Sequence, residues 1–217
     1  MTTLNKIQDV VSRQLMSLAL VSPTYSQSIL QKSIVEATER MTFTLGHLKG
    51  KYFDKVHEHG FDVHNSDQYS MFLYLLANSS WKRTGTDEMA IAVCRLNKAL
   101  HSIDVWFDVE LPSIFRFVHP VGTILGKGRY GDYFAVYQGC TVGGDLSSYP
   151  TLGSKCLMYS HSSIIGASLI GSNCTIGSNT NILKATIPSN SLVVGNGSDQ
   201  RILSNTGNRI CDIFKID

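Results

Sequence analysis

The sequence is poor in charged residues and has no large excess of either sign. Charged residues make up 17% of the 217-residue chain, and 19 basic against 17 acidic residues leave a formal charge of +2. A soluble domain usually carries about a quarter charged residues, and nucleic-acid binding normally needs a basic patch. The composition therefore argues against a nucleic-acid partner and against a polybasic membrane anchor.

Long apolar runs and paired cysteines are also missing. No stretch approaches the roughly 18 uncharged apolar residues of a membrane span, and the first residues show no signal-peptide core. The five cysteines include no Cys-x-x-Cys pair, which argues against a disulfide framework or a zinc site. We expect a cytoplasmic protein with reduced thiols, and its length fits one domain or one domain with an extension.

Glutamate and glycine are distributed unequally between the two halves of the chain. Glu110 is the only glutamate after residue 100, whereas fourteen of the 18 glycines lie there. We therefore expect an N-terminal helical domain in residues 1–101, a second domain in residues 102–203 and a C-terminal tail in residues 204–217.

Amphipathic spacing predicts helices in the first of these parts. The apolar patterns cover residues 7–18, 29–41, 65–81 and 86–100. The third pattern opens on Asn65 followed by Gln68, a pair typical of a helix N-terminus. The role we expect for these helices is packing or oligomerisation, without chemistry of their own.

One segment of the helical part contains several potential metal ligands. His57, His59 and His64 lie close together, with Glu58 and Asp62 between them. Such side chains do bind divalent metals, but this spacing matches no established ligand motif. We therefore expect an exposed loop and no metal site.

An apolar residue recurs every six positions in the second half. The column consists of Leu152, Met158, Ile164, Ile170, Ile176 and Ile182, preceded by Tyr130, Val136 and Val142 in phase with Ile124. This period fits a coil with three flat faces, each face turning one side chain inward. Cys156 and Cys174, 18 residues apart, would then stack on successive coils. The expected fold class is α+β: an N-terminal α-helical region followed by a left-handed parallel β-helix of hexapeptide repeats.

Two features depart from the regular repeat. Val142 and Leu152 are ten residues apart, so residues 143–151 should form a protruding loop. Lys155 and Lys184 are the only Asp, Glu, Lys or Arg residues between Leu152 and Ser198. Faces so poor in charge suggest burial between subunits. We predict a homotrimer, which the helical region could join into a dimer of trimers.

The repeat resembles the serine acetyltransferase family over residues 72–195. Ser102-Ile-Asp-Val and His119-Pro-Val-Gly-Thr-Ile-Leu-Gly are similar to the family's Ile-Asp-Ile and His-Ala-Thr-Gly-Ile-Val-Val-Gly, at the same separation. Gln138-Gly-Cys-Thr-Val-Gly-Gly resembles Gln-Ser-Val-Thr-Leu-Gly-Gly, and Tyr149-Pro-Thr-Leu-Gly resembles His-Pro-Lys-Ile-Gly. The resemblance implies an acyltransferase that uses acetyl-CoA as acyl donor.

This chemistry suggests roles for particular residues. Acyl transfer to a hydroxyl needs a base, for which we choose His119, and a carboxylate that orients it, either Asp104 or Glu110. His161 is the other histidine of the coils, and we expect it to be an outward-facing coil residue. Backbone N–H groups near Gly143 and Gly144 could stabilise the oxyanion. The residues expected to contact acetyl-CoA are Gly143, Gly144, Ser163, Lys184 and Arg201, and those expected to contact the acceptor are Tyr149 and Asp145.

Departures from the family pattern concern the acceptor. Tyr149 stands where the serine enzymes have a histidine that contacts the acceptor, and the loop over residues 143–151 is shorter than theirs. We therefore favour a hydroxyl of a sugar or surface polysaccharide as the acceptor. Serine O-acetylation, N-acetylation of an amino-sugar nucleotide and a non-catalytic binding scaffold are the alternatives.

Overall fold

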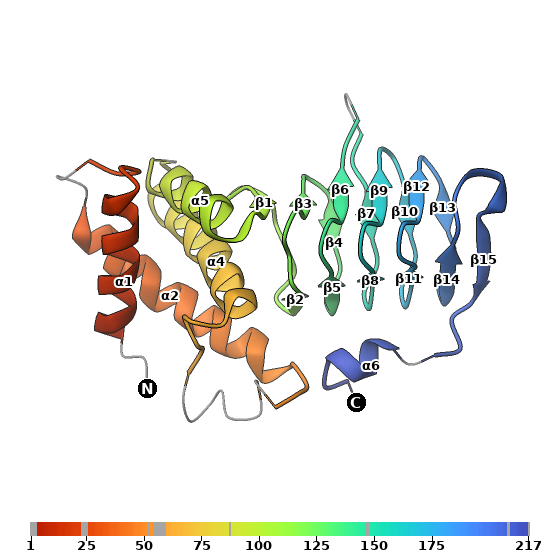
Figure 1. The fold of residues 1–217 in the computed structure, drawn as a ribbon, viewed down its shortest axis with the longest axis horizontal. Helices are drawn as coiled ribbons and strands as arrows, with labels where there is room; N and C mark the ends of the chain where they lie inside the picture. Colours follow the sequence, from red (N-terminus) through yellow and green to blue (C-terminus); the bar gives the residue numbers. More distant parts are fainter. Residues whose placement is uncertain are drawn as a thin grey trace.

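The first half of the protein is helical. The computed structural model describes residues 4–22, 26–51, 53, 60–86, 88–145, 148–207 and 209–216. Its helices here are α1 (Leu4–Ser17), α2 (Gln27–Gly46), α4 (Ser66–Thr84) and α5 (Glu88–His101), as Figure 1 shows. They cover the four segments that the apolar spacing predicts. Among the described residues, no helix combines the length and the apolar character that crossing a bilayer would require.

Helix α4 is the central helix of this half. Its predicted N-cap is confirmed, because the Asn65 side chain accepts a hydrogen bond from the Gln68 backbone N–H at 3.1 Å. Every residue from Gln68 to Ser80 is buried, on all sides of the helix. The Tyr74 hydroxyl donates to the Val109 carbonyl at 2.8 Å, and the Asn78 amide donates to the Phe107 carbonyl at 2.8 Å. Helix α4 therefore packs against the other helices and also against the start of the second half.

The second half is a parallel β-solenoid of about five turns, with the left-handed hexapeptide architecture that the repeat predicts. The five-stranded sheet consists of β1 (Asp104–Val105), β3 (Ile124–Leu125), β6 (Thr141–Gly143), β9 (Ser163–Ile165) and β12 (Asn181–Leu183). The four-stranded sheet consists of β4 (Arg129–Tyr130), β7 (Thr151–Leu152), β10 (Leu169–Ile170) and β13 (Thr186–Ile187). The six-stranded sheet consists of β2 (Phe115–Phe117), β5 (Phe134–Val136), β8 (Leu157–Met158), β11 (Thr175–Ile176), β14 (Ser191–Val194) and β15 (Arg201–Ser204). The pairing is parallel throughout, except that β15 runs antiparallel to β14.

The predicted column of inward side chains is confirmed from Tyr130 to Ile182. Its nine members have relative exposures between 0% and 9%. Its upstream phase is wrong, because Ile124 is 47% exposed whereas Leu125 is 1% exposed and pairs with Val142. The step from Leu125 to Tyr130 is only five residues, so the phase shifts by one and Ile124 faces outward.

The coils turn at corners with left-handed backbone angles, and the predicted loop protrudes from them. Asn173 and Asn179 adopt left-handed backbone angles, with φ of 57° and 58°. Cys156 and Cys174 are free thiols on successive coils. The two coils are hydrogen-bonded here, because the Leu157 N–H donates to the Cys174 carbonyl at 2.9 Å. Between β6 and β7 the chain leaves the coil as a protruding loop, and Asp145 and Ser148 pair across it.

The C-terminal segment returns from the last coil to the helices. After β15 the chain forms helix α6 (Arg209–Ile213), which lies beneath the coils in Figure 1. Phe214 is fully buried and meets the Tyr133 ring edge to face, with 5.6 Å between the ring centroids. The Lys49 N–H donates to the Ile213 carbonyl at 2.9 Å. The tail therefore connects the coils to the end of α2.

Candidate active site

His119 lies at the corner between β2 and β3. Its backbone adopts a left-handed conformation with φ of 48°. The backbone carbonyl of His119 accepts from the Val121 N–H at 2.7 Å, which closes the turn. The side chain is 77% exposed. The corner thus presents an imidazole that a reactant can reach.

Asp67 holds this corner against the helical half. It lies in the first turn of α4, and its carboxylate Oδ1 accepts a hydrogen bond from the His119 backbone N–H at 3.0 Å. The same oxygen is 3.7 Å from His119 Nδ1, and the Asp67 side chain is only 19% exposed. A carboxylate near Nδ1 stabilises the imidazolium that forms when the ring accepts a proton at Nε2.

Arg116 is a second charged group at this corner. It alternates with the buried Phe115 and Phe117 along β2, so its side chain points outward from the coil. The guanidinium carbon lies over the Phe53 ring, 4.8 Å from its centroid. Burial lowers the pKa of Arg116, and its Nε atom is buried without a hydrogen-bond partner among the described residues.

These groups share one cavity. Its volume is about 320 Å³, and Asp67, Arg116 and His119 line it together with Phe53 and the start of α4. A cavity of this size suits a small molecule. The arrangement therefore combines an imidazole, a carboxylate and a partly desolvated cation around a space of a size for a small molecule.

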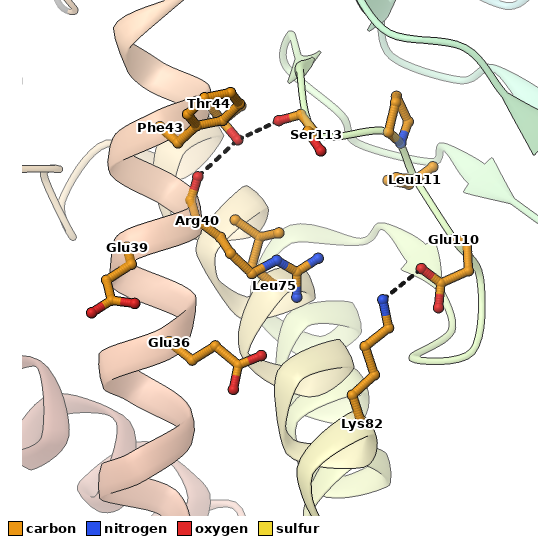
Figure 2. Close-up of a pocket in the computed structure, with 11 residues that line it drawn as sticks. Glu36, Glu39, Arg40, Phe43, Thr44, Leu75, Lys82, Glu110, Leu111 and Ser113 are labelled. Atoms are coloured by element: carbon orange, nitrogen blue, oxygen red, sulfur yellow. Dashed lines mark hydrogen bonds and ion pairs between the residues drawn. The ribbon is translucent and has the colours of Figure 1, made fainter.

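The two carboxylates that the sequence suggests as partners of His119 lie elsewhere. Asp104 is on β1, in register with Ile124 on the neighbouring coil, and its carboxylate pairs with the Lys98 ammonium at 2.6 Å. Glu110 pairs with Lys82 at 2.7 Å and lines a different cavity, of about 480 Å³, between α2 and α4 (Figure 2). The described structure records no contact of either carboxylate with His119, so their role as its partner stays a prediction.

A second group of the predicted site residues gathers around the protruding loop. The Lys184 ammonium pairs with the Asp145 carboxylate at 2.6 Å, and Lys184 together with the Ser148 hydroxyl lowers the pKa of Asp145. Gly144 lies under the Tyr149 ring, because an added Cβ would be 2.6 Å from its Cδ1 atom. Tyr149 is 51% exposed and lines a third cavity, of about 460 Å³.

The remaining predicted contacts for the donor are distributed along the coils. The Gly143 carbonyl accepts from the Gly166 N–H at 2.9 Å. The Ser163 hydroxyl donates to the Asn181 side chain at 2.7 Å. Arg201 is exposed at the start of β15, and its side chain has no recorded hydrogen bond or ion pair with the described residues. The structure thus brings Asp145, Lys184 and Tyr149 close to Gly144, but no recorded contact joins them to His119 within one chain.

Sequence reasoning missed Asp67 and Arg116. Asp67 lies 52 residues before His119, so no local motif links the two. Arg116 did leave a signal, because it is the only Asp, Glu, Lys or Arg between Glu110 and Lys127. A single charged residue between two buried phenylalanines indicates a side chain that faces outward and has a specific interaction to make.

The histidine-rich segment lies mostly outside the described residues, which leave out His57, Glu58 and His59. Of its other members, Asp62 accepts from the His64 backbone N–H at 2.9 Å through its side chain. Within the part of the chain that the structure describes, no group of three potential metal ligands occurs.

The fold matches solved structures, whereas no family model and no curated protein matches the chain. A serine acetyltransferase from Vibrio cholerae O1 biovar El Tor N16961 aligns with a TM-score of 0.70 and 15% identity, over 94% of this chain and 80% of its own. The Brucella abortus strain S19 serine acetyltransferase in complex with coenzyme A gives 0.66 and 18%, over 92% and 83%. Serine acetyltransferase isoform 3 from Entamoeba histolytica, in complex with cysteine, gives 0.63 and 18%, over 93% and 76%. At these identities the likeness establishes the shared fold.

Proposed function

We propose that the protein is an acetyl-CoA-dependent O-acetyltransferase that acts on a small hydroxyl-bearing acceptor, with His119 as the general base. The observation that carries this proposal is the exposed imidazole of His119, with Asp67 Oδ1 at 3.7 Å from Nδ1 inside a cavity of about 320 Å³. With Nδ1 facing the carboxylate, Nε2 is the nitrogen that faces the acceptor.

The residues at the corner fit a direct transfer. Nε2 of His119 takes the proton of the acceptor hydroxyl while the hydroxyl oxygen bonds to the thioester carbonyl carbon. The carbon–sulfur bond then breaks, and the imidazolium returns the proton to the departing thiolate. Asp67 stabilises the imidazolium in between, because opposite charges at this separation attract. Neither a metal nor a redox partner is needed for the balance of this reaction.

Coenzyme A as donor would need cationic groups for its phosphates. The Arg201 side chain is exposed and has no recorded hydrogen bond or ion pair with the described residues, so its guanidinium could bind a phosphate. Lys184 could do so only by exchanging its partner Asp145. One of the solved structures with this fold holds coenzyme A, which supports the choice of donor.

For the acceptor we favour L-serine over the sugar hydroxyl that the sequence suggests. Solved structures that share the fold are serine acetyltransferases, and one is a complex with cysteine, an amino acid of nearly the same shape as serine. The cavity beside His119 is of a size for such a molecule. Sugars and capsule-type oligosaccharides are the second candidate, favoured by Tyr149 in place of the family's histidine.

We further propose that the active form is a homotrimer. Ile124 and Leu183 on the five-stranded sheet are 47% and 65% exposed, and Leu169 on the adjacent sheet is 51% exposed. Contact with neighbouring copies would cover these apolar side chains. It would also allow the Tyr149 corner of one copy to approach the His119 corner of another. Light scattering should give a mass near three chains, and Leu183→Asp should lower both this mass and the activity.

The function is tested by following free thiol release from acetyl-CoA. L-serine, glucosamine, amino-sugar nucleotides and capsule-type oligosaccharides are offered in turn to the full chain. His119→Ala should lower the rate with the best acceptor by about 10²- to 10⁴-fold. His47→Ala, at the end of α2, serves as the matched control and should keep the wild-type rate. Thiol release that no acceptor stimulates, or full activity of His119→Ala, would refute the proposal.

A further inference from the structure

Arg116 has no anionic partner within hydrogen-bond distance among the residues that the structure describes. Its guanidinium makes no recorded hydrogen bond or ion pair with the described residues, and Nε is buried without a partner. The Asp67 carboxylate is close enough to influence it, but its Oδ1 is already bound to the His119 backbone N–H at 3.0 Å. A partly desolvated cation without a counter-ion is costly. Such a cost is offset when a ligand brings the missing anion.

The surroundings of Arg116 fix where that anion must lie. The guanidinium carbon of Arg116 lies over the Phe53 ring, 4.8 Å from its centroid, and attraction to the ring helps to hold the cation in place. Arg116 and His119 are three residues apart on the same turn of the coil and line the same cavity. An anion bound by Arg116 would therefore lie in the same cavity as the His119 imidazole.

We infer that Arg116 binds a carboxylate of the acceptor and so selects a hydroxy acid over a neutral alcohol. A planar guanidinium edge matches a carboxylate through two parallel hydrogen bonds, which a neutral amide or a sugar hydroxyl cannot reproduce. The inference rests on the proposed acetyl transfer at His119. Two sources share this chemistry, a hydroxy-amino acid such as serine and an acidic sugar such as a uronic acid. Nearby Asp67 favours the amino acid, because its carboxylate can face an ammonium group.

The experiment compares acceptors that differ in the carboxylate alone. L-serine is paired with L-serinamide, and D-glucuronate is paired with D-glucose, using the full-length chain and acetyl-CoA. The wild type should prefer the acid of the productive pair by roughly tenfold to a hundredfold in kcat/KM, the range for a charge-assisted hydrogen-bond pair. Arg116→Met should abolish this preference by lowering kcat/KM for the acid while leaving the neutral analogue nearly unchanged. Arg116→Lys should keep part of the preference, and Arg13→Met on the surface of α1 should keep all of it.

The outcomes separate this inference from the proposed function. Equal rates for acid and neutral analogue in the wild type, or an equal loss with both in Arg116→Met, would overturn the role of Arg116 while leaving acetyl transfer in place. If Arg116→Met fails to fold, the inference is still tested by comparing the acid with its neutral analogue in the wild type and in Arg116→Lys. If no acceptor stimulates thiol release, the proposed function fails, and calorimetric binding of L-serine against L-serinamide tests Arg116 by itself. Weaker binding of serinamide would support the inference, and equal binding would overturn it.

Discussion

Replacing Asp67 by asparagine tests which carboxylate supports the base. Asparagine can still accept the hydrogen bond from the His119 N–H, so the change removes the charge and leaves the corner in place. At 3.7 Å the attraction between unit charges is about 1 kcal/mol in a water-like medium and about 4 kcal/mol at a dielectric constant of about 20. Because the His119 side chain is 77% exposed, the lower part of this range applies, about 1–2 kcal/mol. We therefore expect Asp67→Asn to reduce kcat roughly 5- to 30-fold.

The assay is thiol release from acetyl-CoA at saturating acceptor, with thermal unfolding recorded for each variant. Asp67→Ala should lose more, because the backbone N–H of His119 then also loses its acceptor. Asp9→Asn, which changes an exposed carboxylate of α1, should behave like the wild type. Asp104→Asn is the decisive comparison, since the sequence suggests this residue as the partner of the base. A large loss in Asp104→Asn together with an unchanged Asp67→Asn would refute the structural argument.

Three further predictions concern the scaffold. Phe214→Ala removes a fully buried ring from the C-terminal tail, and such losses cost about 3–5 kcal/mol. Urea unfolding should show this decrease, and a loss below about 1 kcal/mol would mean that the tail adds little to stability. Gly139→Ala would place a Cβ atom 2.3 Å from His161 Nδ1 at a φ of 68°. The melting temperature of Gly139→Ala should be lower than that of the wild type, and adding His161→Ala should restore part of the loss. If nothing is restored, the whole effect comes from backbone strain. Burial raises the pKa of Cys156 to about 12, so iodoacetamide at about pH 8 should label Cys211 first in the native protein, because the thiolate is the reactive form. Equal labelling by mass spectrometry would contradict this order.

The coils could be predicted from the sequence because their signal is local. Inward positions follow one another by six residues, apart from the ten residues between Val142 and Leu152, and the nine members of the column from Tyr130 to Ile182 are all buried. The phase fails where a coil is one residue shorter. Between Leu125 and Tyr130 the step is five residues, and the same step returns between Ile182 and Ile187. Ile124 and Leu125 are both aliphatic, so the sequence offered no chemical reason to choose between them.

The sequence singles out His119 as a candidate base, but it does not reveal what surrounds this residue. His119 falls within a motif and at a corner, which local patterns can reveal. Asp67 reaches it only because α4 packs against the first coil through contacts such as the hydrogen bond from the Tyr74 hydroxyl to the Val109 carbonyl. No periodicity encodes that docking. The ion pair between Asp104 and Lys98 could not be predicted either. Both residues lie near the predicted helix end, and only the geometry of their side chains shows that they pair.

The return of the tail to α2 gives the molecule an order of assembly. Helix α2 ends at Gly46, yet the Lys215 ammonium that binds its carbonyl at 3.2 Å is 169 residues further along the chain. Synthesis runs from the N-terminus, so the helices can form before Lys215 has been synthesised and can make this contact. Contacts of such separation also close slowly, because a long loop must be ordered first. A product that stops before Lys215 would therefore lack this contact, and the Gly46 carbonyl at the end of α2 would stay open to solvent.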